Sequence, residues 1–390
     1  RIYAPDLTGH DNFGEAIDLQ GSLALIGAPR RRNATNASCG GVYFIDFSDP
    51  ESPIALGAVS PVEGTNIDSF GQAVAWDGDL AIIGSPGISQ SGKSAGGVYI
   101  YRVSTQERLA RYVPTVASGS TVLQMGGSVD IRGTIAIAGA PLASDAAINA
   151  GAVFLMDLSD PEHPVVQRKL ASDAGIVDYF GTSVALGDGI AVVGAPRDND
   201  NGLVDSGSVY FLNSSTGAQL GKLHAPVPQA GAQFGGFVRI EGNVLIVGSP
   251  YWDWTEFNNP DCGTIDLFDI ADPANPVHIT SLLVGAIKSY DALGEAVAIS
   301  GSRIVAGVPV GTNEALVATG AAYTFYVQIP APGCPGDING DDLTNAADFT
   351  ILAGTFGSAV APNTSGDLNG DGLVNAADFV ILAGDFGCEN

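Results

Sequence analysis

Short runs of alternating apolar and polar residues, each followed by a fully apolar run, recur along residues 1–327. Residues 180–211 form one complete unit of this pattern. In it the alternating run Ser183 to Leu186 is followed by the turn Asp188-Gly189 and then by the apolar run Ile190 to Val193. Glycine supplies the positive φ that a tight hairpin turn needs, and a fully apolar run is typical of a strand that is covered on both faces. The unit therefore begins with a predicted β-hairpin whose second strand is buried.

The same unit occurs six times. Each copy has an aromatic or aliphatic residue followed by glycine, then a Gly-x-Pro element, and then a third run. The Gly-x-Pro elements, which lie 54 to 59 residues apart, begin at Gly27, Gly84, Gly139, Gly194, Gly248 and Gly307. A period of this length is in the range of propeller blades and is too long for a single hairpin.

A fourth strand follows the third run in most units. Proline turns such as Asp49-Pro50 and Asp160-Pro161 lead into further extended runs, for example residues 55–59 and 166–170. Four strands per unit is the composition of a propeller blade. We therefore expect a mainly β fold, a six-bladed β-propeller with four-stranded blades.

The two ends of the repeat region are complementary. Residues 1–5 align without a gap to residues 222–226, which form a fourth strand, whereas the sixth unit ends near Val327 without one. We therefore expect residues 1–5 to pair with residues 323–327 and to close the last blade within one chain. The alternative is donation of this strand to another copy of the protein, because unpaired sheet edges favour association. A seventh blade would need residues that precede Arg1, and we favour six.

These units resemble FG-GAP repeats, which are known from the β-propeller heads of integrin α-subunits and from many secreted bacterial proteins. The resemblance rests on the following dipeptides, each with the Gly-x-Pro element after it: Phe13-Gly14, Phe70-Gly71, Phe180-Gly181 and Phe234-Gly235. It implies a propeller domain over residues 1–327. A Pro-rich linker, residues 328–335, then leads into a separate domain, residues 336–390.

Two acidic segments in the second domain repeat one another at an interval of 30 residues. Their residues occupy positions 1, 3, 5, 7, 9 and 12 of a calcium-binding loop: Asp337, Asn339, Asp341, Leu343, Asn345 and Asp348 in the first, and Asp367, Asn369, Asp371, Leu373, Asn375 and Asp378 in the second. Calcium binds about six to eight oxygen ligands, and this spacing turns successive side-chain oxygens inward, with a main-chain carbonyl at position 7. We therefore expect two calcium ions, one in each loop.

Each loop leads directly into the same sequence, Asn-Ala-Ala-Asp-Phe-x-Ile-Leu-Ala-Gly-x-Phe-Gly. This tandem resembles a type I dockerin, a calcium-dependent docking module of cellulosome-like assemblies. The resemblance implies a small α-helical domain and a protein partner, either a cohesin-like domain or another copy of this chain. Two differences from the usual type I dockerin sequence affect the expected calcium binding and the expected partner. Asp342 replaces the glycine usual at position 6, which weakens the first loop, and Ala346-Ala347 and Ala376-Ala377 replace hydroxylic recognition residues. The alternative is that calcium only holds a small domain together.

Four cysteines in a chain of this kind favour disulfides over metal sites. Cys334 and Cys388 bracket the dockerin-like domain, and we interpret them as a disulfide that closes it. Cys39 and Cys262 take equivalent places before the third runs of units one and five, where direct pairing is geometrically poor in a six-bladed ring. These two remain either reduced thiols or an intermolecular bridge.

Loops between the second and third runs are expected on one face of the ring. They include the aromatic residues Tyr251, Trp252, Trp254 and Phe257 and the basic residues Arg30, Arg31 and Arg32. Clustered aromatic residues in a loop suit a protein contact or sugar stacking, so we expect a protein partner and a possible glycan on this face. The alternative is an aromatic plug that covers its own blade.

The composition narrows the function classes. The chain of 390 residues has 16 Lys and Arg against 42 Asp and Glu, a net charge of −26. Such a charge repels nucleic acid and anionic membrane surfaces, and no apolar run is long enough for membrane insertion. The acidic excess and the start at Arg1 favour a processed extracellular protein, secreted or attached to the cell surface.

No catalytic constellation stands out in the sequence. The histidines are scattered over different units, at His10, His163, His224 and His278. No pair of carboxylates is distinguished from the other acids, so we expect a protein that is not an enzyme. The prediction is a binding or scaffold protein that assembles in an extracellular structure. The alternative is a carbohydrate-active enzyme that uses the propeller face and is tethered by the dockerin-like domain.

Overall fold

The structure, a computed structural model, describes residues 2–4, 6, 11–32, 38–61, 68–90, 92–116, 122–199, 202–253, 261–284, 291–309, 320–327, 338–339, 343–360, 366–368 and 372–386. The chain forms two compact units, Arg1–Val327 and Gln328–Asn390. No helix in these described ranges is long and apolar enough to cross a membrane.

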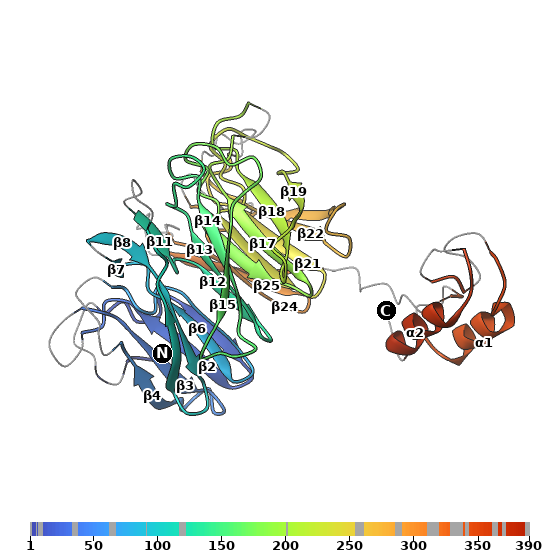
Figure 1. Ribbon diagram of the computed structural model, residues 1–390, viewed down its shortest axis with the longest axis horizontal. Helices are drawn as coiled ribbons and strands as arrows, with labels where there is room; N and C mark the ends of the chain where they lie inside the picture. Colours follow the sequence, from blue (N-terminus) through green and yellow to red (C-terminus); the bar gives the residue numbers. More distant parts are fainter. Residues whose placement is uncertain are drawn as a thin grey trace. The chain divides into compact units, whose positions relative to one another are not determined.

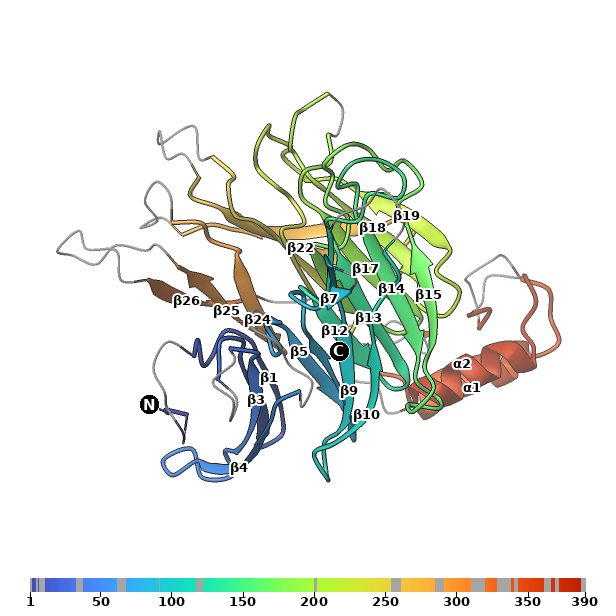
Figure 2. The same ribbon diagram turned by 60° about the vertical axis from the view of Figure 1, so that its left-hand side comes forward.

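Within its described residues, the first unit is built of six antiparallel sheets, numbered here in chain order, and one small sheet with a parallel strand pair (Figures 1 and 2). Sheet 1 contains β1 (Ile17–Gln20), β2 (Leu23–Ala28), β3 (Gly41–Asp46) and β4 (Ile54–Val59). Sheet 2 contains β5 (Val74–Asp77), β6 (Leu80–Gly84), β9 (Val98–Arg102) and β10 (Glu107–Tyr112). Sheet 3 contains β12 (Val129–Arg132), β13 (Ile135–Ala140), β14 (Ala152–Asp157) and β15 (Val165–Lys169).

The second half of this unit repeats the arrangement. Sheet 4 contains β16 (Ser183–Leu186), β17 (Ile190–Ala195), β18 (Ser208–Asn213) and β19 (Gln219–Leu223). Sheet 5 contains β20 (Phe237–Glu241), β21 (Val244–Ser249), β22 (Thr264–Asp269) and β23 (Val277–Leu282). Sheet 6 contains three described strands, β24 (Ala296–Ser300), β25 (Arg303–Val308) and β26 (Ala321–Tyr326). A small additional sheet contains β7 (Ser89–Gln90), β8 (Lys93–Gly96) and β11 (Val122–Met125).

Each numbered sheet is a meander whose neighbouring strands follow one another in the chain, as the repeat pattern predicts, except that β7 and β8 of the additional sheet lie between β6 and β9 of sheet 2. In sheet 4, Ser183 lies opposite Gly194 and Leu186 opposite Ala191, so the predicted hairpin forms. Gly189 at its turn has φ +71°, the conformation for which glycine is needed. The fold is therefore mainly β, with four-stranded antiparallel sheets of the kind found in propellers.

The hydrophobic core lies between successive sheets. One cluster combines Ile137 and Val153 of sheet 3 with Val193 and Tyr210 of sheet 4. The ring of Phe180, which precedes sheet 4, packs edge-on against Tyr210 with ring centroids 5.3 Å apart. Complete burial of such a side chain contributes about 1.5–3 kcal/mol. Phe180 thus helps to attach sheet 4 to the sheet before it.

Glycines set the spacing between successive sheets. A Cβ atom built on the Gly-x-Pro glycine of one sheet would lie 1.9–2.0 Å from a carbonyl oxygen of the next sheet, that of the glycine in its Phe-Gly or equivalent pair. The contacting glycines are Gly27 and Gly71, Gly84 and Gly126, Gly139 and Gly181, Gly194 and Gly235, and Gly248 and Gly294. Real Cβ atoms do not approach so closely. The two most regular features of the repeat therefore form the junctions between neighbouring sheets.

Sheet 6 and sheet 1 do not share a glycine contact of this kind among their described residues. A Cβ atom at Gly307, the equivalent position in sheet 6, would have Ala296 of its own sheet as its nearest neighbour, at 3.7 Å. Gly14 has nothing within 4 Å of its Cβ position. In the described part of the chain, the close glycine contact thus occurs between five successive pairs of sheets and not between sheets 6 and 1.

The N-terminal residues also differ from expectation. Ile2 to Ala4 belong to no strand, and β26 has no further strand beside it among the described residues. The structure therefore does not show the predicted pairing of this segment with residues 323–327. Instead Ala4 is buried against Ala24 and Ile26 of sheet 1, because the small side chain fills the apolar face of that sheet. Arg1 and Pro5 lie outside the described residues.

The second unit contains the helices α1 (Ala346–Thr355) and α2 (Ala376–Asp385), which lie side by side (Figure 1). A small core of Leu352, Val374 and Leu382 holds them together.

Candidate functional site

Both predicted calcium loops end in the same helix cap. The side-chain oxygen of Asn345 accepts a hydrogen bond from the N–H of Ala347 at 2.7 Å, and the carboxylate of Asp348 accepts one from the N–H of Asn345 at 2.8 Å. Asn375 and Asp378 repeat this arrangement at the start of α2. Positions 9 and 12 of each loop therefore form a capping box that fixes where the helix begins.

The two position-12 carboxylates also reach back to the beginning of their loops. Asp348 accepts a hydrogen bond from the N–H of Ile338 at 2.8 Å, and Asp378 accepts one from the N–H of Leu368 at 2.7 Å. Burial alone would raise the pKa of Asp348, but the surrounding N–H groups outweigh it and hold this pKa below its usual value. Each loop is thus closed around a buried carboxylate.

The chemistry of the second unit fits calcium. Asp348, Asp367 and Asp378 are 0%, 1% and 0% exposed, yet residues 304–390 contain no Lys, Arg or His. Buried charge is costly unless a counter-charge accompanies it, and the chain supplies no cation of its own here. Carboxylate, amide and carbonyl oxygens are the ligands that calcium prefers.

The structure places eight of the twelve predicted ligands. The others, Asp337, Asp341, Asn369 and Asp371, lie outside the described residues, as do Cys334 and Cys388. Across the residues that are described, no three His, Cys, Asp or Glu side chains stand together in a way that would hold a metal ion. Both remaining cysteines, Cys39 and Cys262, are buried thiols. The ligand set and the disulfide therefore stay predictions.

Aromatic rings are exposed on the helices of the second unit. Phe349, Phe356, Phe379 and Phe386 are between 42% and 57% exposed. Phe349 and Phe379 pack edge-to-face with centroids 6.1 Å apart. Together with Ala346, Leu382, Ala383 and Phe386 they line an apolar groove of about 410 Å³. Exposed apolar patches of this kind mark interaction sites, so the rings provide a surface for a partner.

The three arginines predicted to form a basic face on the first unit, Arg30, Arg31 and Arg32, differ in their exposure. The Arg31 side chain is 20% exposed and donates to the Tyr43 hydroxyl at 2.9 Å and to Ser60 Oγ at 2.6 Å. It also pairs with Asp6. Arg31 therefore joins the N-terminal segment to sheet 1, whereas Arg30 and Arg32 are exposed.

The predicted aromatic loop is described up to residue 253. Tyr251 is 44% exposed. Trp252 is half-buried, and its carbonyl accepts a hydrogen bond from the N–H of Gly263 at 3.0 Å, so its backbone helps to hold the loop. Trp254 and Phe257 lie outside the described residues.

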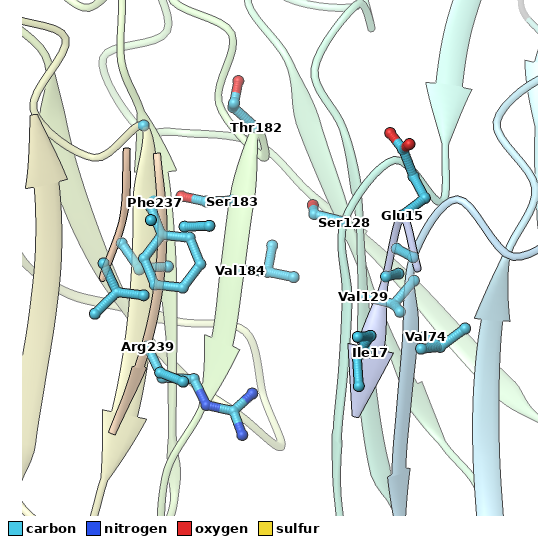
Figure 3. Close-up of a pocket in the computed structure, with 18 of the residues that line it drawn as sticks. Glu15, Ile17, Val74, Ser128, Val129, Thr182, Ser183, Val184, Phe237 and Arg239 are labelled. Atoms are coloured by element: carbon cyan, nitrogen blue, oxygen red, sulfur yellow. The ribbon is translucent and has the colours of Figure 1, made fainter. Parts of the chain in front are cut away.

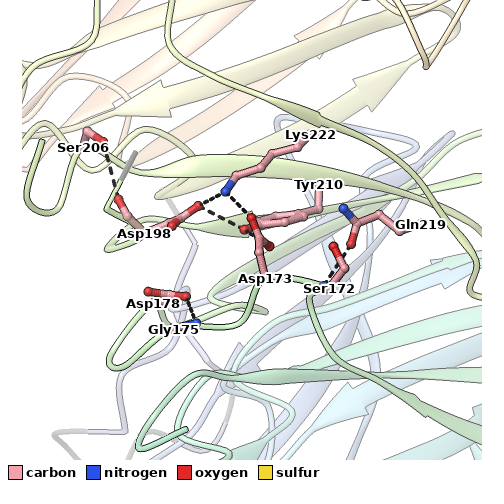
Figure 4. A network of polar contacts seen from close by, with 9 residues as sticks. All are labelled: Ser172, Asp173, Gly175, Asp178, Asp198, Ser206, Tyr210, Gln219 and Lys222. Atoms are coloured by element: carbon pink, nitrogen blue, oxygen red, sulfur yellow. Dashed lines mark hydrogen bonds and ion pairs between the residues drawn. The ribbon is translucent and has the colours of Figure 1, made fainter. Parts of the chain in front are cut away.

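A polar network in sheet 4 was not anticipated from the sequence (Figure 4). The Lys222 ammonium lies 2.7 Å from a carboxylate oxygen of Asp173 and 2.6 Å from one of Asp198. The Tyr210 hydroxyl lies 2.9 Å and 3.0 Å from the same two carboxylates. Burial alone would lower the pKa of Lys222, but the carboxylates outweigh it and raise this pKa, so the ammonium stays charged. The network joins strands β18 and β19 to the loops that carry Asp173 and Asp198.

Sequence analysis also missed a polar cluster in sheet 5. Asp266 stands in β22 at the place that Tyr43 and Tyr210 take in sheets 1 and 4. It accepts a hydrogen bond from Ser281, whose hydroxyl oxygen lies 3.1 Å from Nε2 of His278. The sequence did contain a sign of this cluster, because aspartate stands in this repeat where the repeats of sheets 1 and 4 have tyrosine. Ser281 thus lies between Asp266 and His278 and contacts both side chains.

The first strands of all six sheets line one cavity of about 540 Å³. Figure 3 shows Glu15, Ile17 and Val129 on one side of it and Val184 and Arg239 on the other. Among its described lining residues, Glu15 and Arg239 are the ionisable ones. A pair of acids at the spacing of a glycosidase is therefore not present in this lining.

Comparison with known protein families gives two matches. The FG-GAP repeat model matches residues 1–45, 59–101 and 165–212. The model of the dockerin type I domain matches residues 335–386. No curated protein matches the chain. Both resemblances drawn from the sequence are thereby confirmed.

Proposed function

Because the chain carries FG-GAP repeats and a type I dockerin domain, we propose that it is a non-catalytic scaffold protein of the extracellular space, secreted or attached to a cell surface. The dockerin domain docks onto a protein partner, a cohesin-like domain or another copy of this chain. The single observation that carries the proposal is a match to a docking domain that exposes four phenylalanine rings, two on its helices and two directly after them. The loop face of the first unit adds contacts to a protein or a glycan.

Two calcium ions complete the dockerin domain in this proposal. The ligands are those predicted from the spacing, Asp337, Asn339, Asp341, Leu343, Asn345 and Asp348 for one ion and Asp367, Asn369, Asp371, Leu373, Asn375 and Asp378 for the other. Calcium supplies the positive charge that residues 304–390 lack, and its binding free energy becomes folding free energy of the loops. Asp348 and Asp378 couple each loop to its helix through the capping boxes.

We propose further that the six sheets are the blades of one six-bladed β-propeller. Support comes from the first strands, β1, β5, β12, β16, β20 and β24, which line a common cavity. Five junctions between successive sheets repeat the same glycine contact. Residues 1–5 belong to the sixth blade as its fourth strand.

The alternative function, a tethered carbohydrate-active enzyme, needs a pair of acids in a groove. One carboxylate, that of Glu15, is found in the described lining of the cavity, so we favour the scaffold.

Calcium titration of the full chain tests the docking proposal. We expect isothermal titration calorimetry of the chelator-treated protein to give two calcium ions per chain, and far-UV circular dichroism to show helix gained on binding. Light scattering after size exclusion, with calcium and with chelator, then measures assembly of the protein with itself. Failure to bind calcium would refute the proposal for the dockerin domain. An unchanged mass would leave a separate protein as the partner.

A further inference from the structure

The cavity lined by the first strands has a largely apolar wall. Each of the six first strands contributes one branched aliphatic side chain to it, namely Ile17, Val74, Val129, Val184, Val238 and Val297. Figure 3 shows Ile17, Val129 and Val184 around the same space. The volume of about 540 Å³ is in the range of cavities that hold small molecules. The wall therefore suits the apolar body of a small ligand.

The polar side chains of this lining, apart from Arg239, are already hydrogen-bonded within the protein. The Gln72 side chain donates to the Glu15 carboxylate at 3.2 Å. The hydroxyls of Ser128, Thr182 and Ser183 donate to main-chain carbonyl oxygens at 2.7–3.0 Å. A sugar would bring many hydroxyl groups, and each buried hydroxyl that lacks a partner costs free energy. The lining therefore favours an apolar ligand over a glycan.

Arg239 in β20 is the exception among these polar side chains. It is exposed, and Figure 3 shows its side chain extending from β20 into the cavity. Among the residues that the structure describes, its guanidinium makes no hydrogen bond and no ion pair. A guanidinium offers planar N–H donors that fit a carboxylate with two parallel hydrogen bonds. Arg239 is therefore available to a carboxylate that enters the cavity.

Two carboxylates near Arg239 are held by other groups. Asp18 accepts a hydrogen bond from the N–H of Trp76 at 2.8 Å, and Asp130 accepts one from the N–H of Leu186 at 2.7 Å. Each carboxylate is thus fixed to the first strand of the next sheet. Burial raises the pKa of both groups, and the charge of Arg239 only partly opposes this. The two carboxylates therefore influence Arg239 through their field and leave its donors to a ligand.

We propose that this cavity binds an aliphatic carboxylate, with the carboxylate on Arg239 and the alkyl chain against the ring of valine and isoleucine side chains. The two parts of such a ligand match the two features of the lining, an apolar wall and one guanidinium without a partner in the described chain. The site belongs to the first unit alone. It adds a small-molecule ligand to the docking function proposed above and does not depend on it.

Ligands of graded chemistry test the proposal on the unaltered full chain. Saturation-transfer NMR at pH 5.5 measures the dissociation constant of hexanoate, because Asp130, whose pKa burial raises to about 6, is then mostly protonated and repels an anion less. We expect 1-hexanol, which lacks the charge, to bind at least about tenfold more weakly. Acetate should lose about fourfold for each CH₂ group that it lacks. Equal affinity of 1-hexanol would overturn the role of Arg239, and equal affinity of acetate would overturn the role of the apolar wall.

A matched pair of variants then locates the bound hexanoate. Arg239→Gln removes the guanidinium from the cavity, whereas Arg132→Gln removes the same charge from β12, where Arg132 pairs with Asp188 at 2.7 Å outside the described lining. We expect Arg239→Gln to weaken hexanoate binding at least about tenfold and Arg132→Gln to leave it unchanged. Unchanged binding by Arg239→Gln would place the ligand elsewhere and overturn the proposal, as would equal losses in both variants. Neither measurement reads calcium binding or docking, so failure here and failure of the proposed function are distinguished.

Discussion

An added methyl group at Gly84 isolates the contribution of the glycine contacts to stability. In the Gly84→Ala variant the new Cβ atom would lie 2.0 Å from the carbonyl oxygen of Gly126, the first backbone atom of the next sheet that it meets. Ordinary contact begins near 3.4 Å, so the backbone of one sheet must move by about 1.4 Å. Overpacking of this kind costs typically about 1–3 kcal/mol, and we expect the upper end because both sides are backbone. About 3 kcal/mol corresponds to roughly a 150-fold change in the ratio of folded to unfolded protein.

The matched control is Gly127→Ala, one residue beyond the contacted glycine. A Cβ atom there meets only the Gln124 carbonyl oxygen, at 3.7 Å, and the residue has no positive φ. Alanine at such a site stabilises by about 0.5 kcal/mol, because it restricts the unfolded chain. The pair therefore predicts opposite signs from the same substitution at two nearby positions.

Urea unfolding of the two variants and the parent measures this difference. Trp76 in β5 is 8% exposed and lies in the same sheet as Gly84, in the core between sheets 1 and 2, so its fluorescence reports the unfolding of the sheet that carries the substitution. We expect Gly84→Ala to unfold at clearly lower urea than the parent, and Gly127→Ala at the same or slightly higher urea. Coincident curves for the two variants would refute the view that glycine contacts set the spacing of the sheets.

Two further predictions concern carboxylates. Burial raises the pKa of Asp130 to about 6, although the N–H groups of Leu186 and Ile131 oppose it. The folded state therefore binds this proton more tightly than the unfolded state, and the free energy of unfolding falls as pH rises from about 4 to about 6. We expect Asp130→Asn to raise the free energy of unfolding by about 2 kcal/mol at pH 7. The variant should also show a flatter dependence of urea unfolding on pH. In the dockerin domain, we expect Asp378→Ala to lower the melting temperature of the helices in calcium more than Asp348→Ala does, because Asp342 is expected to weaken the first loop. Circular dichroism measures both melting temperatures, and equal shifts would contradict that ranking.

Local chemistry explains what the sequence predicted well. The turn at Asp188-Gly189 and the apolar run after it are decided by neighbouring residues, so the hairpins could be placed from the pattern alone. The spacing of Asn375 and Asp378 was interpreted as calcium chemistry, and the same two residues also cap α2. A capping box uses the residue types of a calcium loop at the same interval, and the pattern therefore carried both signals.

Contacts between distant residues explain what the sequence did not predict. Arg31 was placed on a partner face because three arginines in a loop suggest exposure, but Asp6, 25 residues earlier, turns it toward the protein. The Lys222 network joins Asp173 and Asp198, which are far from it in sequence. The contact between a Gly-x-Pro glycine and a glycine of the next repeat could not be predicted from local sequence, because a turn explains either glycine equally well.

The glycine contacts have a consequence for how such a protein can diverge. Because peptide atoms set the distance between neighbouring sheets, that distance does not depend on which side chains fill the space around it. Met125 and Leu293 replace phenylalanine before Gly126 and Gly294, yet the contacts at both glycines stay at 2.0 Å. A duplicated repeat therefore keeps its spacing to the next repeat, and the identity of its core residues can change as long as they still pack. The number of repeats, rather than the residues within them, determines how many sheets follow one another at this spacing.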